Sequence, residues 1–192
     1  MSKPTLVLII ILSLLTGALL TLALNKSFLD PNKISELPIP SINPVTPDTT
    51  LLFGSLEFAS SSGIPKTYSL PILINTGTNK VTSVQLELSF DPNVLTNVNI
   101  TSSDFFKNPN VVINKINTDT GRIYYALTKS ASESARQGEN ILATLSFESR
   151  VSSVSSAITF LPRTFVTAEG LEQSALISTN SAILNIQPKL GN

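Results

Sequence analysis

The chain contains short segments in which apolar and polar residues alternate, and the most informative one runs from Val81 to Leu95. Its alternating apolar positions are Val84, Leu86, Leu88 and Phe90. The polar positions between and before them are Ser83, Gln85, Glu87 and Ser89. Successive side chains of a strand point to opposite faces of a sheet, so this pattern predicts a strand with one buried and one polar face. The strand then ends in Asp91-Pro92, a pair typical of turns.

From Leu51 onward the chain consists of short β signals separated by turn residues, without a sustained helical period. The predicted strands are 52–58, 67–75, 81–90, 94–100, 111–116, 122–128, 141–148, 157–161, 165–168 and 182–187. The residues expected to face inward in three of them are Tyr68, Leu70, Ile72 and Ile74, then Ile123, Tyr125 and Leu127, then Ile141, Ala143, Leu145 and Phe147. Such evenly spaced strands predict an all-β sandwich or barrel, and about 140 residues are enough for an independent core.

The N-terminal part contains an uncharged stretch from Thr5 to Leu24. A helix of about 20 residues, rising ~1.5 Å per residue, spans a hydrocarbon core of ~30 Å. After a short flank (1–4), we therefore expect residues 5–24 to form a transmembrane helix or signal anchor. A cleaved signal peptide is the alternative, although Thr21-Leu22-Ala23 is a poor cleavage site. Basic residues near both ends leave the orientation open.

Residues 25–50 contain five prolines among Ser, Asn and Thr residues. This composition favours extended, polyproline-like backbone and offers little to a core. We interpret the segment as a linker that holds a domain over residues 51–188 away from a membrane, followed by a tail over residues 189–192. The expected location is the cell surface, outside the cytoplasm.

The charged and reactive residues exclude several classes of function. Thirteen basic and 13 acidic residues give a formal net charge of zero, so no basic patch points to nucleic acid. The absence of Cys and His removes thiolate sites and the commonest general base and metal ligand. A glycosidase needs two carboxylates about 5–10 Å apart across a cleft, which a sandwich face does not offer. We expect no enzyme activity, no cofactor and no metal.

Five segments in the same order and spacing give the region from Leu51 to Gln187 a family resemblance. They are Leu70-Pro71-Ile72 with Asn75, the run from Leu86 to Leu95 with its Asp-Pro turn, Gly121 with the following Arg-Ile-Tyr-Tyr-Ala, the strand from Gly138 to Phe147, and Phe165 to Gln173. Together they resemble the cohesin domain, the cellulosome scaffold module that binds dockerin modules. The resemblance implies a nine-stranded jelly-roll sandwich, similar in shape to carbohydrate-binding modules.

The resemblance also implies a binding face. In cohesins the dockerin helices lie across one sheet, and the polar side of the strand before the Asp-Pro turn contributes hydrogen bonds. Those positions correspond to Ser83 and Gln85, where well-studied cohesins have an Asn and an Asp, so the sequence departs from the family pattern. The full set expected at the partner contact is Ser83, Gln85, Glu87, Arg122, Tyr124 and Glu172. An ordinary solvated sheet face is the alternative for these residues.

Other interpretations remain open at the level of the sequence. Asp91 and Asp104 are oxygen ligands that calcium would accept, but they lack an Asp-x-Asp-x-Asp spacing, and we favour a turn at Asp91. Carbohydrate binding would need an aromatic platform, for which Tyr124 is the single outward tyrosine. A third alternative is a structural subunit of a surface complex. We expect a monomeric domain that binds a dockerin-like protein or, alternatively, a polysaccharide.

Overall fold

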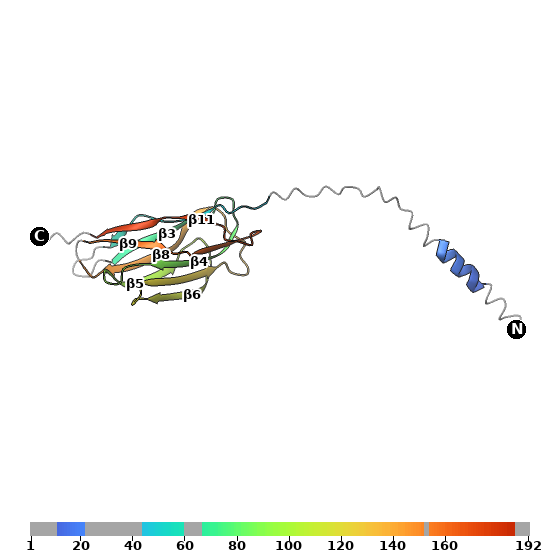
Figure 1. Ribbon diagram of the computed structural model, residues 1–192, viewed down its shortest axis with the longest axis horizontal. Coiled ribbons are helices and arrows are strands. Elements are labelled where there is room, and N and C mark those ends of the chain that lie inside the picture. Colours follow the sequence, from blue (N-terminus) through green and yellow to red (C-terminus); the bar gives the residue numbers. More distant parts are fainter. Residues whose placement is uncertain (1–10, 22–43, 60–66, 152–153, 187–192) are drawn as a thin grey trace. The chain divides into compact units, whose positions relative to one another are not determined.

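The computed structural model describes residues 11–21, 44–59, 67–151 and 154–186 (Figure 1). The chain divides into two units, Met1–Asn43 and Pro44–Asn192. In the first unit a helix covers residues 11–21, inside the stretch predicted to be apolar and helical. Among the described residues, no helix combines the length and apolarity needed to cross a bilayer. The remainder of the predicted segment and most of the proline-rich linker lie outside the described residues.

The second unit is built from two β-sheets, which we call sheet A and sheet B (Figure 1). Sheet A has the order β11-β1-β3-β8-β5, with β2 beside β3. Its strands are β1 (Thr49–Phe53), β2 (Glu57–Ala59), β3 (Thr67–Asn75), β5 (Leu95–Ser102), β8 (Glu139–Ser149) and β11 (Leu176–Thr179). Sheet B has the order β12-β9-β4-β7-β6, with β10 beside β4. Its strands are β4 (Val81–Ser89), β6 (Asn110–Asn117), β7 (Arg122–Thr128), β9 (Val154–Phe160), β10 (Phe165–Ala168) and β12 (Ser181–Ile186).

The described residues thus form twelve strands, so the expected count of nine is wrong, although the all-β sandwich is confirmed. The predicted strand 52–58 is split after Phe53, because Gly54 turns toward β3 and its N–H donates to the Pro71 carbonyl at 2.8 Å. A Cβ on Gly54 would lie 2.8 Å from Pro71 Cγ, so this approach requires a glycine. Strand β11 was not predicted, because its four residues, Leu-Ile-Ser-Thr, show no alternation of apolar and polar side chains.

The inward faces of both sheets meet in one apolar core. In sheet B the alternating residues of β4 lie opposite those of β7, with Leu86 paired to Tyr125 and Leu88 to Ile123. All four are at most 1% exposed. The Phe53 ring of sheet A stacks on Phe160 of sheet B, with ring centroids 4.5 Å apart. The alternation in 67–75, 81–90 and 122–128 therefore identified the core faces correctly.

One expected core residue, Ile141, lies instead on the outer face of sheet A with 37% of its surface exposed. Along β8, Ala143 pairs with Ile72 but Ile141 pairs with the next residue, Leu73, so Leu142 is the extra residue of a β-bulge. The bulge changes the phase of the strand, which buries both Leu142 and Ala143 and turns Ile141 outward. Alternation alone did not reveal this shift.

The turn after β4 is organised by Asp91. Its carboxylate Oδ1 accepts a hydrogen bond from the Asn93 N–H at 2.9 Å, as the turn interpretation predicts. Gly121 closes the same corner: its carbonyl accepts the Phe90 N–H at 2.9 Å, its φ is 62°, and a Cβ there would lie 2.0 Å from the Phe90 carbonyl oxygen. Within the described part of the chain, no group of three or more acidic, His or Cys side chains is arranged to hold a metal.

Candidate functional site

The outer face of sheet B carries the polar positions of β4 and β7. The register places Gln85 beside Ala126, Glu87 beside Tyr124, and Ser89 beside Arg122. Side chains of directly opposed residues in an antiparallel pair lie on the same face and contact one another. The alternation that buries Leu86 and Leu88 therefore presents these polar groups on the opposite side.

Glu87 is buried on this face, with 7% of its surface exposed. The segment after β9, residues 161–164, folds back over it. Leu161 N–H donates to the Glu87 carbonyl at 2.8 Å. The Thr164 hydroxyl accepts a hydrogen bond from the Glu87 N–H at 3.2 Å and donates one to the Glu87 carbonyl at 3.1 Å. It thus satisfies backbone groups of β4 that a neighbouring strand would otherwise pair with. The Glu87 carboxylate pairs with Arg122 at 3.8 Å, and 41% of the arginine side chain stays exposed.

Gln85 is also connected to the segment 161–164. Its side-chain Nε2 donates to the Arg163 carbonyl at 3.0 Å. This bond uses one of the two donor hydrogens of the Gln85 amide, which we had expected to face a partner. Gln85 therefore has a structural role in holding the segment 161–164 against β4, whatever else it contacts.

A hollow of about 670 Å³ lies where this segment meets the strands. Its lining residues are Glu87, Asn117, Thr120, Arg122, Tyr124, Leu161, Pro162 and Arg163. Tyr124 is half-buried at its wall, and no hydrogen bond joins its hydroxyl to another residue within the described ranges. A side chain that enters the hollow would meet a phenol and two guanidinium groups.

The structure brings only some of the predicted contact residues together. Glu87, Arg122 and Tyr124 line one hollow, and Gln85 is two residues away along β4. Ser83 continues the same face toward the start of β4, opposite Thr167 of β10. Glu172 does not join the group, because it follows β10, whose last residue pairs with Val81 at the far end of β4 from Glu87.

Sequence reasoning missed the segment 161–164. Pro162 after the apolar end of β9 is a turn signal, but nothing local indicates that the turn returns to β4. Arg163 and Phe165 were not expected at the site for the same reason, and Ile113 was missed because the pairing of β6 with β7, which places it on this face, is not visible in the sequence. Ile113 and Phe165 are 40% and 41% exposed.

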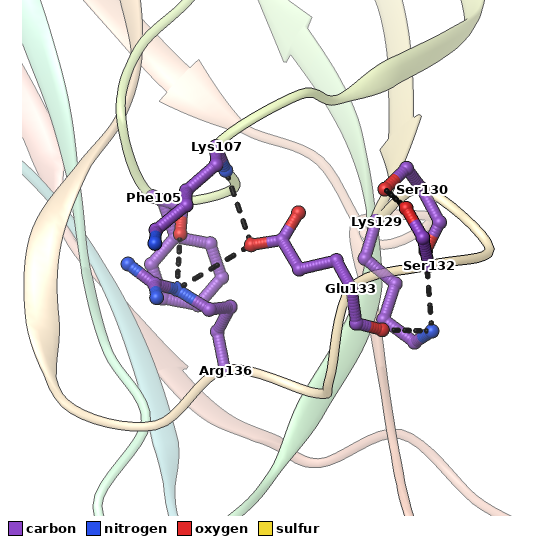
Figure 2. A network of polar contacts seen from close by, with 7 residues as sticks. All are labelled: Phe105, Lys107, Lys129, Ser130, Ser132, Glu133 and Arg136. Carbon is purple, nitrogen blue, oxygen red and sulfur yellow. Dashed lines mark hydrogen bonds and ion pairs between the residues drawn. The ribbon is translucent and has the colours of Figure 1, made fainter.

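A second polar cluster connects the loops before β6 and after β7 (Figure 2). Glu133 Oε1 accepts the Lys107 N–H at 3.1 Å and lies 3.8 Å from Arg136 Nε. Arg136 Nε also donates to the Phe105 carbonyl at 2.8 Å, and Lys129 Nζ donates to the Glu133 carbonyl at 2.6 Å. These bonds fasten two loops together, and the adjoining pocket of about 380 Å³ is lined largely by serine and charged side chains.

Among the ionisable groups that the structure describes, the one with a shifted pKa lies in the core rather than on this face. Burial raises the pKa of Tyr125, and the nearby Ser102 side chain offsets part of that shift. The two groups form no hydrogen bond of normal geometry, and the Tyr125 hydroxyl has no partner among the described residues. The Tyr125 hydroxyl is therefore expected to affect the free energy of unfolding rather than the binding of a partner.

Comparison with known proteins agrees with this fold. The cohesin domain family model matches residues 62–184. Similar solved structures include a Clostridium acetobutylicum cohesin in solution, with 20% identity over 72% of this chain and 91% of that chain, at a TM-score of 0.51. The seventh type I cohesin of ScaB from Pseudobacteroides cellulosolvens has 13% identity over 74% and 94%, at 0.55.

A type I cohesin–dockerin complex from Clostridium thermocellum is 14% identical over 74% of this chain and 97% of that chain, at a TM-score of 0.54. The search of curated proteins finds no match. Identities this low establish the fold alone, whereas the family match covers more than half of the residues. The chain belongs to the cohesin domain family.

Proposed function

We propose that this chain is a non-catalytic docking module that binds a dockerin-type protein module through the outer face of sheet B. The observation that carries the proposal is the exposed face of β4, β7 and β6 in a chain of the cohesin family, with a hollow at Tyr124. The solved complexes of cohesins with dockerins support the class of partner. A face assembled from adjacent strands suits recognition of an amphipathic helix.

The proposed contact set keeps the residues expected from the sequence but weights them differently. Tyr124 and Arg122 line the hollow with part of their surfaces exposed and contribute directly. Gln85 and Glu87 act mainly by holding the segment 161–164 and Arg122 in place. Ser83 lies at the margin of the contact, and Glu172 lies outside it.

The position of the domain in the cell is a separate part of the proposal. The uncharged run from Thr5 to Leu24 supports an N-terminal anchor that displays the domain at the cell surface, in the context of polysaccharide degradation or surface assembly. Fractionation of cells that express the tagged full chain tests it. The chain should stay with membranes after carbonate washing, and its release into the soluble fraction would contradict the anchor.

The binding experiment uses the full chain and a panel of type I dockerin modules. Binding is measured by isothermal titration for the wild type, for Tyr124→Ala and for the double variant Gln85→Ala/Tyr124→Ala. We expect Tyr124→Ala to weaken binding at least about tenfold, as truncation of a buried aromatic anchor commonly does. The double variant should bind more weakly still.

The matched control changes the opposite face. Leu52→Ala/Ile141→Ala truncates two exposed apolar residues of sheet A and should leave the affinity unchanged. If this control weakens binding while Tyr124→Ala does not, the wrong face has been assigned. If no dockerin module binds the wild type, the proposal fails.

Carbohydrate binding remains the alternative function, with less support. Of the three tyrosines, Tyr68 and Tyr125 are buried, at 7% and 1% exposure. A lone half-buried Tyr124 is a small platform for a sugar ring. Retardation of the full chain on a polysaccharide gel, abolished by Tyr124→Ala, would favour this alternative.

A further inference from the structure

The outer face of sheet B is chemically divided along its strands. One row crosses four neighbouring strands through Phe165, Gln85, Ala126 and Ile113, as their registers show. Phe165 and Ile113 are 41% and 40% exposed. This row, which we call the apolar row, presents two large hydrophobic side chains at its ends, with the small Ala126 and the polar Gln85 between them, and the Gln85 amide is turned to the Arg163 carbonyl.

The other end of the face carries positive charge. Lys115 lies beside Tyr124, Arg122 lies one row further along, and Arg163 borders the hollow. Two carboxylates lie near these three cations. Glu87 is buried and already paired with Arg122, and Asp119 lies in the turn between β6 and β7. Lys115 and Arg163 form no ion pair within the described residues. We call Arg122, Lys115 and Arg163 the cationic end.

The dimensions of the face suit one helix. Neighbouring strands are about 4.8 Å apart, so the apolar row spans roughly 14 Å. A helix rises about 1.5 Å per residue and turns once in 3.6 residues, so apolar residues at positions i and i+7 or i+11 lie on one side of it and are about 10–17 Å apart, close to the length of the row. A helix about 10–12 Å wide that is centred on the apolar row extends about 5–6 Å to either side. The cationic end begins about 7 Å from the row along the strands and extends to about 13 Å, so a carboxylate on the flank of the helix would meet the nearer cations through the length of the two side chains rather than through the helix body.

From this division we infer that the partner is an amphipathic helix that packs an apolar stripe on the apolar row and directs carboxylate side chains into the hollow at the cationic end. The inference rests on the proposed docking function and adds the partner's chemistry. Arg122 and Arg163 present planar guanidinium groups, which bind carboxylates in a bidentate manner. A lysine at the same place in the partner would face three cations and is disfavoured.

A displayed library of dockerin modules tests this chemistry. Two positions on the flank of the recognition helix vary among Glu, Ser and Lys, and the library is selected against the full chain. We expect at least about a tenfold enrichment of Glu over Lys. Raising the salt concentration to about 0.5 M should reduce the enrichment, since exposed charge pairs are screened.

Two charge reversals and a control complete the test. Arg163→Glu and Lys115→Glu change exposed side chains without internal ion pairs, so the fold should persist, and each should reduce or reverse the preference for Glu. Arg150→Glu, on the exposed end of sheet A, should leave the preference unchanged.

The outcomes separate the two proposals. Suppose that the selected modules no longer bind the Tyr124→Ala variant of this chain, but show no preference for Glu at the two varied positions, or prefer Lys. The charge inference is then overturned, whereas docking at this face stands. A library that yields no binders, or binders insensitive to Tyr124→Ala, overturns the proposed function and the inference with it.

Discussion

The Thr164 hydroxyl provides a sharp test of how the candidate site is built. It accepts a hydrogen bond from the Glu87 N–H at 3.2 Å and donates to the Glu87 carbonyl at 3.1 Å. Thr164→Val keeps the shape of this buried side chain but removes both bonds. The Glu87 carbonyl still accepts from Leu161, whereas its N–H is left buried without a partner.

The expected cost follows from that single orphaned donor. An unsatisfied buried polar group costs about 1–3 kcal/mol, and because valine and threonine are nearly the same shape, the lost hydrogen bonds rather than packing should dominate the change. For a chain of this size each kcal/mol lowers Tm by about 2–4 °C, so the expected decrease is roughly 2–12 °C. The segment 161–164 should also open, which exposes the Glu87 amide to hydrogen exchange and weakens docking at the hollow.

Urea denaturation followed by circular dichroism measures the change in the free energy of unfolding. The matched control is Thr167→Val, an exposed β10 position whose side chain has no hydrogen bond in the described structure, and it should change stability by less than about 0.5 kcal/mol. The reasoning is refuted if Thr164→Val is as stable as the wild type, or if both variants lose the same stability.

Three further changes test other parts of the structure. Gly121→Ala should destabilise the domain by at least about 1–2 kcal/mol, because φ is 62° and the new Cβ would contact the Phe90 carbonyl; an unchanged Tm would contradict this close contact. Glu133→Ala should cost about 1 kcal/mol and raise exchange at the Lys107 amide, whereas Glu172→Ala, the exposed control, should do neither. For Tyr125, the raised pKa means that the folded state holds its proton more tightly, so stability is constant below the unfolded pKa of about 10 and falls as pH rises above it. Tyr125→Phe should remove that part of the alkaline loss in pH-dependent denaturation, and an identical alkaline profile would contradict it.

The sequence predicted the parts of the fold that depend on local alternation. Strands β4 and β7 have an uninterrupted period of two, so the burial of Leu86 and Tyr125 and the outward position of Gln85 and Tyr124 could be assigned in advance. The turn at Asp91 was equally accessible, because its carboxylate bonds to a residue only two positions later.

Features that depend on distant contacts could not be predicted in this way. The bulge at Leu142 arises from the pairing of β8 with β3 and changes the phase of a strand that otherwise alternates. Thr164 and Glu87 are 77 residues apart in the chain, and no local pattern indicates that they meet. Three of the eight residues that line the hollow, Leu161, Pro162 and the charged Arg163, could therefore not be predicted from the sequence.

Hydrogen exchange of the full chain, with and without a bound dockerin module, would locate the docking face strand by strand. We expect slower exchange on binding in β6, at one edge of sheet B, and in residues 161–165, with little change in the strands of sheet A. Slower exchange confined to β1, β3 and β8, with β6 and residues 161–165 unaffected, would contradict docking through the outer face of sheet B.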